Sequence, residues 1–110
     1  MKLSEQQFDP SLPMHTPISE MDLKSLLEQL PGWQVCQHEL QKFYDFPDFV
    51  SALAFPCRIG DLAESVDHHP AITTEYGKVK VSWWTHTANG ITLNDLVMAA
   101  QTELLYPSAS

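Results

Sequence analysis

Three segments of the chain carry apolar residues at the spacing of one helix face. In the first, leucines recur at i, i+3, i+4 and i+7 before a Pro-Gly pair, which predicts a helix over residues 20–30. A longer stripe predicts a second helix over residues 49–66. Pro56 lies inside it and removes one backbone hydrogen bond, so we expect a kinked helix or two short ones. A third stripe predicts the last helix over residues 92–104.

Shorter segments alternate apolar and polar residues, the pattern of half-buried strands. The predicted strands are residues 33–35, 40–46, 72–76 and 78–86. A short turn separates the first two and Gly77 separates the last two, so each pair is expected to form an antiparallel hairpin. In the last strand, alternate residues share one face: Val79, Val81, Trp83 and Thr85.

The order of the predicted elements is α-β-β-α-β-β-α. Because this order lacks the equal repeats of βαβ units, it predicts an α+β fold, a four-stranded antiparallel sheet with three helices packed on one face. Residues 1–18 contain three prolines and no periodicity, and we expect them to form an N-terminal arm. Residues 19–110 are then one domain, as the length of 110 residues suggests.

Charge and composition narrow the possible partners and compartments. Fourteen acidic against six basic residues give a net charge of −8, which argues against binding to nucleic acid or to an anionic membrane surface. No apolar run is long enough to span a bilayer, and none follows Lys2 as in a secretory signal. These features predict a cytoplasmic protein, in which Cys36 and Cys57 are reduced, partly buried thiols.

Three histidines and two carboxylates are the candidate chemistry. Glu64 and His68 are four residues apart at a helix end, so both side chains can point the same way. His69 follows directly, His86 ends the strand after it, and Asp95 opens the last helix. Because imidazole exchanges protons near neutral pH, this set predicts an acid/base pocket.

Each of these residues also has a plainer interpretation. Adjacent histidines can cap a helix C-terminus, and Thr92 with Asp95 matches a capping box at a helix start. The two roles of Asp95 are compatible. Trp84 is either a pocket wall or part of an oligomer interface. Tyr76 and Trp83 are expected in the core more than in the site.

A metal centre is the competing chemistry, because four of these side chains are permissible zinc or iron ligands: Glu64, His68, His86 and Asp95. Neighbouring histidines point apart, however, and the chain has no HxH or HxxxH pair. We therefore expect no metal.

The spacing Glu64-x3-His68-His69-Pro70-x5-Tyr76-x9-His86-x8-Asp95 resembles the signature of the pterin-4a-carbinolamine dehydratases. The resemblance extends over residues 19–105 and includes the Leu-Pro-Gly-Trp, Trp-Thr-His and Gly-Ile-Thr runs. Two positions depart from the family pattern. Ile72 stands where many members have an aromatic residue, and Pro56 falls within the second helix.

The resemblance implies a hydro-lyase that converts 4a-hydroxytetrahydropterin to quinonoid dihydropterin and water, in tetrahydropterin recycling. It implies a pterin substrate, no cofactor and no metal, and a functional link to an aromatic amino acid hydroxylase. His68 and His86 are the candidates for proton transfer, His69 for holding the pterin, and Glu64 and Asp95 for orienting the histidines. The alternative is a non-catalytic binding or dimerisation partner of another protein.

Self-association is expected on separate grounds. A four-stranded sheet has open edges, and a domain of this size leaves much apolar surface to cover. Family members form dimers and tetramers, so we expect a homodimer or homotetramer.

Overall fold

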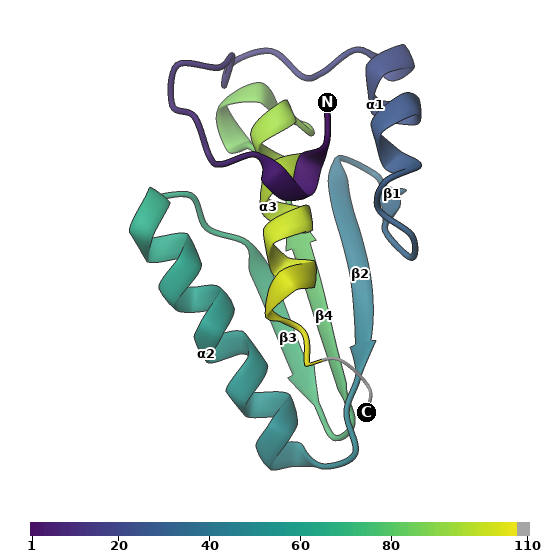
Figure 1. Ribbon diagram of the computed structural model, residues 1–110, viewed down its shortest axis with the longest axis vertical. Helices are drawn as coiled ribbons and strands as arrows, with labels where there is room; N and C mark the ends of the chain where they lie inside the picture. The colour runs from purple at the N-terminus through teal and green to yellow at the C-terminus, as the bar shows by residue number, and fades with distance from the viewer. Residues whose placement is uncertain (108–110) are drawn as a thin grey trace.

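The computed structural model describes residues 1–107, and the last three residues of the predicted domain, 108–110, lie outside the described residues. The predicted α+β fold and its element order are confirmed (Figure 1). The helices and strands are, in chain order, α1 (Glu20–Leu27), β1 (Gln34–Cys36), β2 (Glu39–Asp45), α2 (Phe49–Val66), β3 (Ala71–Glu75), β4 (Lys78–Trp83) and α3 (Leu93–Leu105). Two short 3-10 turns, η1 (Leu3–Glu5) and η2 (His86–Ala88), complete the described secondary structure.

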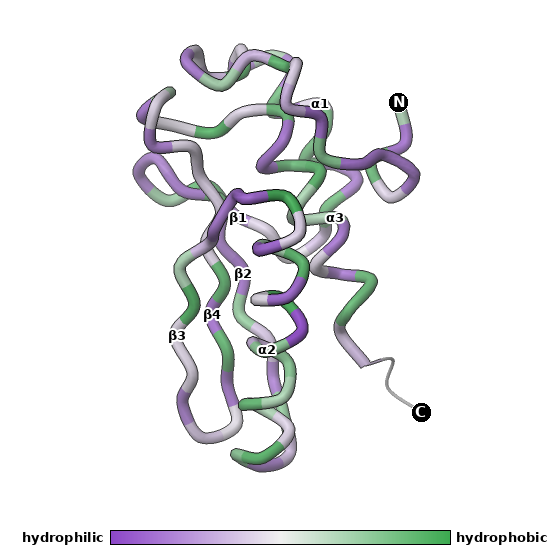
Figure 2. The backbone as a smooth tube through the Cα atoms, turned by 90° about the vertical axis from the view of Figure 1, so that its left-hand side faces the viewer, coloured by the Kyte–Doolittle hydropathy of each residue, from purple (hydrophilic) through white to green (hydrophobic). Residues whose placement is uncertain are grey.

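The four strands form one antiparallel sheet in the order β1-β2-β4-β3. Seen along the sheet, the strands lie on one side of the molecule and α2 and α3 on the other (Figure 2). Helix α2 contacts β3 and β4, and α3 contacts β4 and β2. Helices α2 and α3 therefore cover one face of the sheet, as predicted for these two helices.

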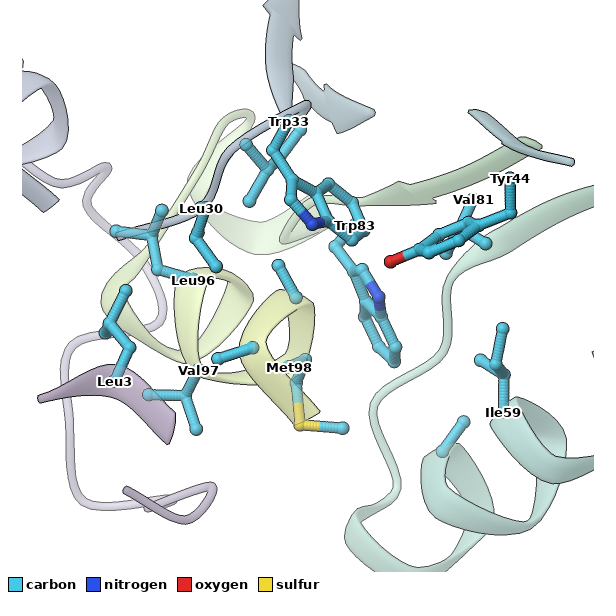
Figure 3. Close-up of a cluster of buried hydrophobic side chains, with 14 of the residues drawn as sticks. Leu3, Leu30, Trp33, Tyr44, Ile59, Val81, Trp83, Leu96, Val97 and Met98 are labelled. Carbon is cyan, nitrogen blue, oxygen red and sulfur yellow. The ribbon is translucent and has the colours of Figure 1, made fainter. Parts of the chain in front are cut away.

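The predicted inner face of β4 is the centre of the core. Val79, Val81 and Trp83 are fully buried, and Thr85 beyond the strand end is buried too. Figure 3 shows the Trp83 indole among apolar side chains of the sheet and of α3. Its Nε1–H donates to Oγ1 of the buried Thr102, so the polar atom of this core tryptophan has a partner.

Helix α1 is shorter than predicted and ends at Leu27, three residues early. The backbone N–H groups of Glu28, Gln29 and Leu30 bond three residues back. This tighter winding ends the helix before Pro31 and leaves Leu30 buried in a turn.

Helix α2 is one continuous helix through Pro56, so of the two predicted alternatives, a kinked helix or two short ones, the second is wrong. Proline costs this helix one backbone hydrogen bond. Four buried side chains on both sides of Pro56 hold the helix against the sheet and offset that loss: Ala52, Phe55, Ile59 and Ala63.

Strand β4 ends at Trp83, three residues before the predicted end. Thr85 instead forms an isolated bridge with Gly90, and the chain between them makes the η2 turn. His86 is therefore the first residue of a 3-10 turn and not the end of a strand.

Three exposure predictions were wrong. Cys36 and Cys57 are both exposed, because one lies at the end of an edge strand and the other on the outer side of α2. Tyr76 is 77% exposed at the β3–β4 turn and belongs neither to the core nor to the site.

No helix within residues 1–107 is long and apolar enough to cross a membrane.

The first 18 residues pack across α3, the helix that follows the sheet (Figure 1). Leu3 in η1 is buried in the core, and the Ile18 N–H donates to the Ile91 carbonyl 2.8 Å away. The predicted N-terminal arm is thus tied to the domain at both ends.

Candidate active site

The C-terminus of α2 reverses the chain and places the two adjacent histidines. Asp67 adopts the left-handed conformation with φ 53°, and its N–H donates to the carbonyls of Ala63 and Glu64. The His68 N–H also bonds to the Ala63 carbonyl, 3.2 Å away. This helix termination satisfies the last carbonyls and turns the following residues back toward the η2 loop.

A cavity of about 420 Å³ opens where this helix end, the η2 loop and the N-terminal arm meet. The residues that line it are Met14, Asp67, His68, His69, Thr85, His86 and Thr87. The structure therefore brings all three predicted histidines to one cavity. The two predicted carboxylates do not line it, but each bonds a histidine that does.

His68 is held by Asp95 from behind the cavity. The Nε2–H of His68 donates to Oδ1 of Asp95 over 2.7 Å, and the Asp95 side chain is fully buried. The other carboxylate oxygen accepts from the Thr85 hydroxyl at 2.7 Å and from the Thr92 backbone N–H at 2.8 Å. Asp95 therefore orients His68 and closes the predicted capping box of α3 at once.

This bond fixes which nitrogen of His68 is left for another partner. A carboxylate only accepts hydrogen bonds, so Nε2 carries the proton and Nδ1 of the neutral ring holds the lone pair. Within residues 1–107, Nδ1 of His68 has no hydrogen-bond partner, and no buried side-chain nitrogen is left without one. Nδ1 is thus accessible, although only 11% of the side chain is exposed.

His69 and Glu64 form a second, looser pair. His69 Nε2 lies 3.0 Å from Oε1 of Glu64, with half of the His69 side chain and 80% of the Glu64 side chain exposed. Solvent therefore reaches this pair, and its geometry is less constrained than that of His68 with Asp95.

His86 differs from the other two histidines in having no carboxylate partner within residues 1–107. Its ring packs against Trp84 with centroids 4.9 Å apart, and in the described part of the chain its side chain has no hydrogen-bond partner. Both ring nitrogens are consequently available to a ligand in the cavity.

Several residues at the site were not predicted. Thr85 alternates with core residues, so its hydroxyl looked like part of the buried face; its position in the Trp-Thr-His run was the available signal. Met14 and Thr87 lie in segments without periodicity, and the Thr87 hydroxyl donates to the Met14 carbonyl. Asp67 gave only a weak signal, because aspartate is enriched among the few non-glycine residues in the left-handed region but most aspartates lie elsewhere.

The described residues 1–107 contain no group of three or more histidine, cysteine, aspartate or glutamate side chains arranged to hold a metal ion. What the site does offer is two histidine–carboxylate pairs and a third, unpaired histidine around one small cavity. Such a set can donate and accept protons on a small bound molecule.

Comparisons with known proteins agree with this chemistry. The sequence model of the family described as "Pterin 4 alpha carbinolamine dehydratase" matches residues 16–105. A "Putative pterin-4-alpha-carbinolamine dehydratase" of Microcystis aeruginosa is 40% identical over 109 residues, covering 96% of this chain and 94% of the relative. A protein with the same description in Chlorobaculum tepidum is 47% identical over 93 residues, covering 81% and 84%.

A solved structure is also similar. The "transcriptional coactivator/pterin dehydratase" of Brucella melitensis superposes with a TM-score of 0.77 at 30% identity, covering 82% of this chain and 98% of that one. The fold and the site together define a small α+β protein with three histidines at one cavity and a carboxylate bonded to each of two of them. The chain belongs to the pterin-4-alpha-carbinolamine dehydratase family.

Proposed function

We propose that the protein is a hydro-lyase that dehydrates 4a-hydroxytetrahydropterin to quinonoid dihydropterin and water. The observation that carries this proposal is the meeting of His68, His69 and His86 at one cavity, with a carboxylate behind two of them. The family match supplies the substrate class.

The reaction needs an acid that gives a proton to the leaving hydroxyl and a base that removes the N5 proton. The bond between C4a and its hydroxyl oxygen breaks, and the leaving hydroxide takes a proton to become water. The N5 proton is removed, and its electron pair forms the C4a–N5 double bond. No electrons enter or leave the pterin, so the step requires no redox cofactor. Each positioned proton transfer contributes about 10²–10⁴-fold in rate.

The contacts of the histidines support a division of these tasks. His68 presents Nδ1 with its lone pair and is the base for the N5 proton, with Asp95 stabilising the imidazolium that forms. His86 has no hydrogen-bond partner at either nitrogen among residues 1–107 and is the acid that protonates the leaving hydroxyl. His69, with Glu64, holds the pterin ring at the mouth of the cavity.

The test is turnover of freshly generated 4a-hydroxytetrahydropterin. We expect His68→Ala and His86→Ala each to lower kcat by about 10²-fold with little change in KM. His69→Ala should raise KM about tenfold with a smaller effect on kcat. His38→Ala is the matched control, because His38 is exposed in the β1–β2 turn away from the cavity. Activity should also survive exhaustive chelation.

Two results would contradict the proposal in different ways. Wild-type kcat in both His68→Ala and His86→Ala would end the acid/base assignment. If His69→Ala lost kcat and kept KM, the roles of the two adjacent histidines would have to be exchanged.

A second function is favoured by one observation, the "transcriptional coactivator/pterin dehydratase" description of the Brucella melitensis protein. With this function the protein would be a binding or dimerisation partner of another protein. A wild-type protein with no rate enhancement over the spontaneous reaction would leave only this function.

If the protein is the enzyme, we propose that it acts in the cytoplasm and receives its 4a-hydroxypterin substrate from an aromatic amino acid hydroxylase.

A further inference from the structure

The N-terminal arm reaches the candidate active site, although the family match begins only at residue 16. The ring of Phe8 packs against the His68 imidazole, with centroids 5.6 Å apart and planes inclined by 34°. Trp83 stacks on the same imidazole at 5.7 Å and 25°. His68 is therefore held by two aromatic rings and one carboxylate, and the arm supplies one of these three contacts.

The arm is fastened on both sides of Phe8. The fully buried Asn94 accepts from the Asp9 N–H at 3.0 Å and donates to the Asp9 carbonyl at 2.9 Å. On the other side, the Gln101 amide donates to the Gln6 carbonyl at 2.8 Å. Both anchors are side chains of α3, the helix that carries Asp95. Phe8 and the carboxylate that orients His68 are thus fixed to the same helix.

We propose that Phe8 is a positioning residue for His68. Its phenyl ring confines the imidazole in the orientation that keeps Nε2–H on Asp95 and Nδ1 accessible at the cavity, and it shields that hydrogen bond from water. The role assigned to Nδ1 rests on the proposed function, whereas the confinement of the ring does not.

Removal of the phenyl ring leaves a gap beside the imidazole, with only Trp83 and the bond to Asp95 in place. An imidazole that can rotate about its side-chain bonds spends less time with Nδ1 in line with the substrate. Reaction rates are sensitive to such displacements of a reacting group. We expect Phe8→Ala to lower kcat about tenfold and to leave KM within about threefold. Phe8→Tyr keeps the ring and should restore wild-type kcat.

Leu3→Ala is the matched control. Leu3 is the buried anchor at the start of the arm, and it packs in the core rather than against His68. This truncation should lower the free energy of unfolding at least as much as Phe8→Ala, because Leu3 is the more buried side chain. It should leave kcat within about twofold. Equal losses of kcat in the two variants would mean that the arm acts through general stability, which would overturn the proposal.

A measurement on His68 itself separates this proposal from the dehydratase assignment. Nitrogen-15 NMR of the imidazole reports its tautomer and the exchange of the Nε2 proton with water. In Phe8→Ala we expect exchange at least about tenfold faster and a mixture of tautomers, with Phe8→Tyr and Leu3→Ala like the wild type. Unchanged exchange and tautomer in Phe8→Ala would overturn the proposal whatever the kinetics. A wild-type protein without dehydratase activity would instead refute the proposed function and leave this test intact.

Discussion

At the scale of single residues, the Asp95 carboxylate has two roles: it caps the start of α3 and it orients the His68 ring. Asp95 accepts from the Thr92 N–H at the beginning of α3 and from the Thr85 hydroxyl through one oxygen, and from His68 through the other. In each of these three contacts a neighbouring group donates a hydrogen bond to the buried Asp95 carboxylate. The position of His68 is therefore tied to the start of α3, and a change at Asp95 affects both.

Asp95→Asn separates the two roles. The amide oxygen of asparagine can still accept from the Thr92 N–H, so the helix start is kept. The amide NH₂ facing His68 would donate to Nε2, which forces the proton onto Nδ1 and turns the proposed base into a donor. We expect kcat to fall by about 10²-fold, and the midpoint of urea denaturation to change little. The measurement is steady-state kinetics with a denaturation curve.

Asp95→Ala is the comparison for that variant. It removes the bond to Thr92 as well and leaves buried donors without a partner, so it should lose stability by about 1–3 kcal/mol in addition to activity. Wild-type kcat in Asp95→Asn would show that the tautomer of His68 does not matter.

The titratable side chains of this site were easier to predict from the sequence than the residues that hold them in position. His68, His69 and His86 are distinctive because three histidines fall within a short stretch. The Thr85 hydroxyl bonds to Thr92 and Asp95, and the Phe8 ring packs against His68; such contacts depend on partners that the fold brings from elsewhere in the chain. No pattern within either segment indicates those partners.

At the scale of elements, the limits of a helix or strand were predicted well where the apolar pattern and the turn residues indicate the same end. The hairpin of β1 and β2 and the start of α3 lie within a residue or two of their predicted limits. The ends of α1 and β4 were wrong because local turns compete with the periodic pattern. In β4, the bridge of Thr85 with Gly90 continues the alternation of side chains after the strand itself has ended.

The start of α2 gives a prediction for pH dependence. Asp48 caps this helix, and its pKa is lowered because its carboxylate accepts from the Ser51 hydroxyl and then from the Ser51 N–H. A carboxyl with a lower pKa in the folded state contributes stability above its unfolded pKa of about 3.9, and this contribution is lost as the pH falls through the folded pKa. Asp48→Ala should therefore melt at a lower temperature than the wild type at pH 7, with a gap that narrows below about pH 4.

Asp48→Asn is the control for this experiment, because an asparagine cap accepts the same bonds without titrating. Thermal melts of the three proteins between pH 7 and pH 2 give the answer. A gap between wild type and Asp48→Ala that stayed constant over this range would contradict the electrostatic part of the argument.

At the scale of the whole molecule, several large apolar side chains remain exposed, and some of them lie on two surfaces suited to contact with a second chain. One is on α2, where Val50 is 78% and Leu53 46% exposed, and the other is on the uncovered face of the sheet, where Phe43 is 57% exposed. Exposed apolar area of this kind and open strand edges both favour self-association. The net charge of −8 opposes it, although salt screens that repulsion over about 8 Å.

We expect light scattering at micromolar concentration and moderate salt to give two or four times the chain mass of 12.4 kDa. The double variant Val50→Glu, Leu53→Glu tests α2 as the contact, and Phe43→Glu tests the sheet. A mass that stays at 12.4 kDa as the sample is concentrated would contradict self-association. If both variants kept the wild-type mass, neither surface would be the contact, and a strand edge would be the remaining candidate.

The bond between Asp9 and Asn94 also sets an order of events during synthesis. These residues are 85 positions apart in the chain, so the arm cannot be fastened at Asp9 until Asn94 has been made. A ribosome that has produced the arm, the sheet and α2 has not yet released Asn94 or Asp95, and His68 then lacks its carboxylate as well as the anchored Phe8. Because α3 also supplies part of the core, the nascent chain has neither a complete core nor a complete candidate site until this helix has left the ribosome.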